Sequence, residues 1–98
     1  MKRLHLVIKE EARNEIFDAF SWYESKLKGL GKRFVETLDI SFGRISSSPF
    51  SFPKKHKEMR QAIVVHFPFI IIFEIEDNQI IIYAVFNTKR YPKQWSTR

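Results

Sequence analysis

The strongest constraint on the fold is a pair of apolar segments, residues 69–76 and 79–87, that flank the dipeptide Asp77-Asn78. Both segments are rich in isoleucine, valine and phenylalanine, which favour extended backbone, and Asp-Asn suits a two-residue hairpin turn. We therefore expect an antiparallel hairpin. The pairs on its more apolar face are Ile75 with Ile80, Phe73 with Ile82, and Ile71 with Ala84. The other face carries Glu74, Glu76, Gln79, Tyr83 and Asn87, with Ile70, Ile72, Ile81 and Val85.

A third strand, residues 59–67, precedes this hairpin, and Phe67-Pro68 forms the connection. Proline is tolerated there because the start of a strand does not need its N–H. The face that Arg60 joins depends on this turn, since a shift of one residue inverts a strand. Arg60 therefore has two interpretations: an ion pair across the sheet with Glu74 or Glu76, or a functional cation.

The first half of the chain predicts one strand and two helices. Residues 3–8 are branched and apolar, as in a strand, and Glu10, Glu11 and Glu15 place acids where a helix N-terminus favours them. Gly29-Leu30-Gly31 separates this helix from the next, which ends at residues 46–49. Apolar residues at helical spacing are Ala12, Ile16, Ala19, Phe20, Tyr23 and Leu27 in the first helix, and Phe34, Leu38, Phe42 and Ile45 in the second. We expect one α+β domain spanning residues 1–98, in the order β-α-α-β-β-β with a three-stranded antiparallel meander.

Positive charge is concentrated toward the C-terminus. The net charge is +6, and residues 54–98 hold eight basic and four acidic side chains. One basic cluster lies just before the meander and another in the tail after it, where aromatic residues are interleaved. Such a surface is typical of nucleic-acid binding or of binding an acidic protein, although a solvated basic surface would also explain it. The candidate binding residues are Lys54, Lys55, Lys57, Lys89, Lys93, Trp95 and Arg98. Trp95 has a second interpretation, packing on the core.

Several classes of protein are excluded or disfavoured. The three histidines are scattered without the spacing of a metal site, and no phosphate loop or nucleophile elbow is present, so we expect no metal and no cofactor. The longest apolar run, residues 67–73, is too short to cross a bilayer. The absence of cysteine fits a reducing compartment. We expect a cytoplasmic protein with no membrane partner.

A set of short motifs resembles a known family. In order along the chain these are Trp22-Tyr23-Glu24, Gly29 to Phe34, Ser48-Pro49, Arg60, Phe67-Pro68-Phe69, and Arg90 to Trp95 followed by Arg98. Together they resemble the RelE/ParE toxin superfamily of bacterial type II toxin–antitoxin modules, and most closely the branch often labelled plasmid stabilisation proteins. The resemblance implies a growth-inhibiting toxin. It would be neutralised by an acidic, partly disordered antitoxin in a toxin–antitoxin hetero-oligomer.

The superfamily has two activities, and the sequence leaves both open. RelE-like members cleave mRNA in the ribosomal A site, whereas ParE-like members inhibit DNA gyrase and perform no chemistry themselves. A RelE-like site uses Lys and Arg on one sheet face with a C-terminal Tyr, and it would place Arg60, Arg90 and Tyr91 in catalytic roles here. Asn87 stands where many relatives have His, so that set is incomplete. Gyrase binding is therefore our first hypothesis. The alternatives are a ribosome-dependent endoribonuclease and a non-toxic antitoxin-binding relative.

Overall fold

The structure is a computed structural model that describes residues 4–89. Its elements follow the expected α+β order, with one short strand and one short helix added between the second long helix and the meander. They are β1 (His5–Ile8), α1 (Glu10–Lys26), α2 (Leu30–Ser47), the 3-10 helix η1 (Pro49–Ser51), β2 (Lys54–His56), β3 (Met59–Ile63), β4 (Phe69–Glu76) and β5 (Gln79–Asn87). The predicted fold is confirmed, and β2 extends its meander by one strand.

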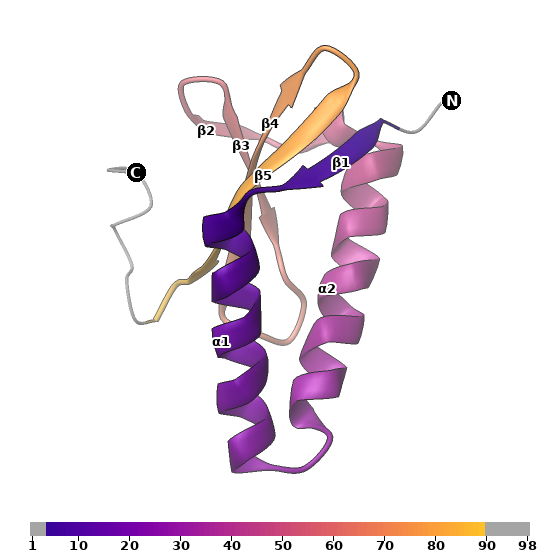
Figure 1. The fold of residues 1–98 in the computed structure, drawn as a ribbon. Helices are drawn as coiled ribbons and strands as arrows, with labels where there is room; N and C mark the ends of the chain where they lie inside the picture. The colour runs from indigo at the N-terminus through magenta and orange to yellow at the C-terminus, as the bar shows by residue number, and fades with distance from the viewer. Residues whose placement is uncertain (1–3, 90–98) are drawn as a thin grey trace.

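One five-stranded sheet, in the order β1-β5-β4-β3-β2, forms the centre of the molecule (Figure 1). β1 pairs with β5 in parallel, while the other neighbouring strands are antiparallel. The helices α1 and α2 run side by side, and α1 packs over β5. Parallel pairing of the first strand beside the last requires a crossover connection, and the helical hairpin supplies it.

The main core lies between the helices and one face of the sheet, which we call the inner face. Side chains from every long element meet there. The largest fully buried ones are Phe34, Leu38 and Ile45 from α2, and Ile71, Phe73, Ile80, Ile82 and Val85 from the sheet. A second, smaller cluster lies on the opposite, outer face and consists of Ile70, Ile72, Ala84 and Phe86. The central strands are therefore buried on both faces, which is why β4 reads as a nearly continuous apolar run.

The turn between the helices is tied together by Glu24. Its carboxylate accepts hydrogen bonds from the N–H groups of Gly29, at 2.8 Å, and Gly31, at 2.9 Å. Gly29 has φ +90°, a conformation that glycine adopts without steric cost. α1 ends at Lys26, so the expected extension of its apolar face to Leu27 is wrong: Leu27 has extended backbone and is exposed.

The predicted register of the hairpin is correct near the turn and wrong beyond Tyr83. Ile75 pairs with Ile80 and Phe73 with Ile82, but Ile72 pairs with Ala84 because Tyr83 is an extra residue in β5. This bulge inverts the rest of the strand. Ile71 consequently lies opposite Val85 instead of Ala84, Val85 joins the inner core, and Ala84 faces outward.

Just past the bulge, a side chain of α1 accepts a hydrogen bond from a backbone N–H of β5 that has no strand beside it. β1 reaches only as far as Ile82 on β5, so the next part of that strand edge has no neighbouring strand. The N–H of Val85 instead donates to the Glu15 carboxylate at 2.9 Å. A side chain from a helix thereby satisfies a backbone donor inside the core, where an unpaired N–H would be costly.

Candidate functional site

The β2–β3 hairpin carries the first basic cluster predicted from the sequence. Lys54, Lys55 and Lys57 are exposed on it, and Lys57 occupies the tight turn with a left-handed backbone. Lys54 Nζ lies 3.0 Å from the Glu58 carboxylate. Exposed pairs of this kind stabilise by at most about 1 kcal/mol, so Lys54 can exchange that partner readily. These lysines form a solvated cationic edge on the short strand β2 and the turn that follows it.

Arg60, at the start of β3, points to the inner side of the sheet. It pairs in register with Phe73, and its guanidinium donates to the main-chain carbonyl of Phe52 at 2.6 Å. The same guanidinium stacks over the Phe50 ring at 5.3 Å. Glu74 lies on the outer face, so the expected ion pair across the sheet with Glu74 or Glu76 does not form. Arg60 instead fastens the segment after α2 to the sheet.

The predicted tail residues can be placed only in part. Arg90, Tyr91, Lys93, Trp95 and Arg98 lie outside the described residues. Lys89 is exposed just after β5, and its N–H donates to the Asn87 side chain. Arg60 is level with Ile82 across the sheet. From Ile82, β5 continues for five residues to Asn87, roughly 15 Å at the rise of a strand, and Lys89 follows that end. Lys89 and the lysines of the β2–β3 hairpin therefore belong to different ends of the sheet.

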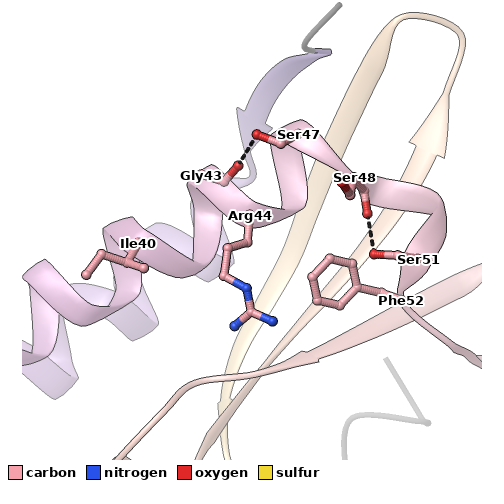
Figure 2. A pocket seen from close by; sticks show the side chains of 7 residues that line it. All are labelled: Ile40, Gly43, Arg44, Ser47, Ser48, Ser51 and Phe52. Carbon is pink, nitrogen blue, oxygen red and sulfur yellow. Dashed lines mark hydrogen bonds between the residues drawn. The ribbon is translucent and has the colours of Figure 1, made fainter. Parts of the chain in front are cut away.

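A pocket that the sequence analysis missed lies at the C-terminal end of α2 (Figure 2). We call it the α2 pocket; its volume is about 510 Å³, and it is lined by Ile40, Gly43, Arg44, Ser47, Ser48, Ser51 and Phe52. The Arg44 side chain extends beside the Phe52 ring, with the guanidinium carbon 5.9 Å from the ring centre. Gly43 lines the pocket with bare backbone, and a Cβ added there would meet nothing within 4 Å. The sequence signal was a glycine–arginine pair before the serine-rich helix end.

A second pocket, of about 660 Å³, lies between the N-terminus of α1, the β2–β3 turn and the outer face of the sheet. Near its centre the Tyr83 hydroxyl donates to the Glu74 carboxylate at 3.0 Å. Burial, and next the hydrogen bond to Glu74, raise the pKa of Tyr83 above 10.0. Glu10, Glu11 and Glu58 also line this pocket, against Lys9 and Lys57. Its acids thus outnumber its lysines, contrary to what a phosphate site requires.

Residues 4–89 contain neither a metal-binding cluster nor a membrane-spanning helix. That part of the chain contains no group of three or more histidine, cysteine, aspartate or glutamate side chains arranged to hold a metal ion. None of its helices combines the length and the apolar character that crossing a membrane requires.

Comparison with known proteins identifies the family. No curated protein matches the sequence. The structure is similar to a chain of a solved structure titled "Chromosomal ParDE TA system from P. aeruginosa", with a TM-score of 0.78 and 12% sequence identity over 89% of this chain and 98% of that one. At this identity the likeness shows the fold. The sequence model of the family described as "ParE toxin of type II toxin-antitoxin system, parDE" matches residues 6–92. The chain therefore belongs to the ParE toxin family of type II toxin–antitoxin systems.

Proposed function

We propose that this protein is a growth-inhibiting toxin that acts in the cytoplasm by binding DNA gyrase, and that an acidic antitoxin neutralises it. In this proposal the protein performs no chemistry. The module to which it belongs would stabilise a plasmid or a chromosomal segment, because cells that lose the short-lived antitoxin are inhibited by the toxin that remains. The family match supports the toxin role, and the geometry of Arg60 favours binding over catalysis.

Arg60 is the single observation that carries this choice. Metal-free RNA cleavage needs cations that face the scissile phosphate and stabilise its developing charge. The Arg60 guanidinium instead faces the inner side and donates to the Phe52 carbonyl at 2.6 Å. A charge-assisted bond of this kind is among the stronger hydrogen bonds in proteins, so redirecting Arg60 toward a phosphate would cost part of its stabilisation.

The outer face of the sheet supports the same conclusion. The pocket there is lined by Glu10, Glu11, Glu58 and Glu74, and Glu74 accepts the hydrogen bond from the Tyr83 hydroxyl. Like charges raise the free energy of bringing an RNA phosphate into that space. Tyr83 is also a weak proton acceptor, since its raised pKa keeps the phenol neutral at physiological pH. An endoribonuclease would therefore have to rely on the exposed lysines of the β2–β3 hairpin and on residues of the tail.

Two assays on the same purified protein decide between the mechanisms. In the first, gyrase supercoils a relaxed plasmid with increasing amounts of the protein; we expect supercoiling to be inhibited. In the second, primer extension maps cleavage of an actively translated mRNA; we expect the message to stay intact. Cuts within codons that require translating ribosomes would refute the gyrase proposal. Full gyrase activity, an intact message and normal growth of cells that express the protein would identify a non-toxic antitoxin-binding relative.

A matched variant sharpens the second assay. Lys54, Lys55 and Lys57 are exposed, so replacing all three with alanine should leave the fold intact. If the protein is an endoribonuclease, this triple variant should cleave less, because the hairpin lysines would be among its exposed cations. If it binds gyrase through another surface, inhibition of supercoiling should remain within about twofold of the wild type.

A further inference from the structure

The α2 pocket carries a cation that the fold leaves available. Among the residues that the structure describes, no acidic side chain lies within ion-pair distance of the Arg44 guanidinium. The Phe52 ring holds that guanidinium on one side by a cation–π contact. A cation that is oriented by an aromatic ring, and has no internal counter-ion, is ready to pair with an anionic group from outside.

Two apolar side chains in the walls of the pocket favour a ligand that also carries an apolar group. Ile40, one turn before Arg44 on α2, is 67% exposed, and the partly buried Phe52 lies on the other side of Arg44 along the pocket. The hydroxyl groups of Ser47 and Ser51 already donate to main-chain carbonyls, at 3.0 Å and 2.7 Å. Their oxygens are therefore left as acceptors near the rim. A ligand that fits this arrangement presents an apolar side chain to the isoleucine and phenylalanine, and a carboxylate to the arginine.

Gly43 determines how closely such a ligand can approach. It lies in the interior of α2, where glycine destabilises a helix by about 0.5–1 kcal/mol relative to alanine, yet an alanine Cβ would meet no neighbouring atom within 4 Å. Nothing in the packing of the described residues therefore requires glycine here. A bare backbone at the centre of a pocket does permit another chain to lie against the helix.

We propose that the α2 pocket is a docking site for an acidic peptide segment, which places an aliphatic side chain against Ile40 and Phe52 and a carboxylate on Arg44. In the function proposed above this segment belongs to the antitoxin, and that identification rests on the proposed function. The docking itself depends only on the pocket's shape and charge.

Nucleic acid is the poorer fit for this surface. Glu36 and Asp39 lie one turn before Ile40 and Gly43 on the same helix, at the i, i+4 spacing that makes side chains neighbours. The carbonyls at the C-terminal end of α2 add partial negative charge. Successive phosphates of a nucleic acid would be repelled by these carboxylates and carbonyls, and only Arg44 would attract them. A peptide can instead place one carboxylate on Arg44 and an apolar side chain beside it.

The test uses a defined probe and backbone amide NMR. A short blocked peptide composed of glutamate and leucine is titrated into the intact protein. A peptide with lysine in place of glutamate and an oligoribonucleotide serve as matched probes. We expect the acidic peptide to shift the amides around Gly43, Arg44 and Ser48, and Arg44→Gln to weaken its binding about tenfold. Acidic-peptide shifts that are absent or centred elsewhere, or an oligoribonucleotide that shifts the pocket amides more strongly, would overturn the proposal.

Two variants at one position control for folding. Gly43→Gln inserts a neutral side chain into the pocket and should abolish the pocket shifts, while Gly43→Ala adds one methyl group and should bind the acidic peptide within about twofold of the wild type. Both replacements favour the helix, so lost stability cannot explain lost binding. Equal binding by both variants would contradict the proposed site.

The outcome separates this inference from the proposed function. The peptide titration does not depend on toxicity or on gyrase, so it can succeed while the gyrase assay fails. If the protein inhibits growth and an antitoxin restores it, Gly43→Gln should remain inhibitory and need at least tenfold more antitoxin than the wild type for neutralisation. Normal neutralisation of that variant would show that the antitoxin does not use the α2 pocket.

Discussion

The two glycines of α2 provide a sharp test of the packing, because the same substitution should change stability in opposite directions. Gly31 lies where α2 begins beside α1, and Gly43 lies near the other end of the same helix. An alanine Cβ at Gly31 would lie 2.6 Å from the main-chain oxygen of Phe20, whereas one at Gly43 would meet nothing within 4 Å. We expect Gly31→Ala to destabilise the protein and Gly43→Ala to stabilise it.

The expected size of each effect follows from these distances. Ordinary van der Waals contact begins at 3.4 Å, so the Cβ at residue 31 is 0.8 Å too close to a backbone atom that cannot rotate away. It would also lie 2.9 Å from Glu24 Oε1, and moving that carboxylate strains its bonds to the interhelical turn. Overpacking costs about 1–3 kcal/mol, and the gain in helix propensity offsets less than about 1 kcal/mol near a helix start. For Gly43→Ala, we expect a gain of about 0.5–1 kcal/mol.

Urea denaturation followed by circular dichroism measures both free energies of unfolding. In a domain of this size 1 kcal/mol corresponds to about 4–8 °C in Tm, so Gly31→Ala should melt roughly 4–20 °C below the wild type and Gly43→Ala a few degrees above it. The slope with urea should stay constant, since neither change alters the surface exposed on unfolding. Equal shifts in the two variants, or a more stable Gly31→Ala, would refute the argument that the α1–α2 contact is too close for a methyl group.

Three further predictions concern hydrogen-bonded side chains. Arg60→Met keeps the aliphatic part of the side chain but removes the N–H donors to the Phe52 carbonyl. Because the guanidinium is only partly buried, we expect the free energy of unfolding in urea to fall by about 1–2 kcal/mol. An unchanged urea midpoint would show that this hydrogen bond does not hold the segment before β2. Tyr83→Phe tests stability at alkaline pH, because burial and the hydrogen bond to Glu74 raise the pKa of Tyr83 above 10.0. The stabilisation from the neutral phenol is complete below pH 10.0 and is lost as the pH rises through the pKa of Tyr83 in the folded state. The variant should show a smaller fall in Tm at high pH, and an identical fall would exclude this group as a cause. Glu24→Gln tests stability at acid pH, because the hydrogen bond from the N–H of Gly29 is the main cause of a Glu24 pKa below 4.5. The stabilisation from the Glu24 carboxylate is present above pH 4.5 and disappears as the pH falls through the pKa of Glu24 in the folded state. Wild type and variant should converge in Tm at low pH, and a constant difference down to pH 2 would contradict this origin.

The order of elements could be predicted from the sequence because each rests on a local signal. The Asp77-Asn78 turn between apolar runs specified the hairpin, and Gly29-Leu30-Gly31 specified the break between helices. Residues near the turn paired as predicted, since the register of a hairpin is set by its turn. The bulge at Tyr83 has no such signal in this sequence. It depends on the fit of the outer face around the Tyr83–Glu74 bond and on Glu15 of α1, which is 70 residues away from Val85.

The α2 pocket was missed for a related reason. The basic residues that stand out in the sequence are clustered, whereas Arg44 stands alone between a glycine and an isoleucine. Its position becomes significant only when the chain turns after Ser48 and returns Phe52 to the end of α2. The serine-rich end of the helix indicated where α2 stops. It carried no information about which residue would then face the arginine.

Arg60 shows why a count of basic residues does not identify a nucleic-acid surface. In the sequence it belongs to the same cluster as Lys54 and Lys57, and a RelE-like role was one of its two interpretations. In the fold it faces the inner side, because β3 ends at Ile63 and the turn that follows fixes its register to β4. Its charge is then used to satisfy a carbonyl of its own chain. A cation engaged in this way contributes to the net charge of +6 and to long-range attraction, and a phosphate would have to compete with the Phe52 carbonyl for it. The functional question therefore depends on which cations the fold leaves unengaged. Arg44, which has an aromatic contact but no ion pair among the described residues, is one of them.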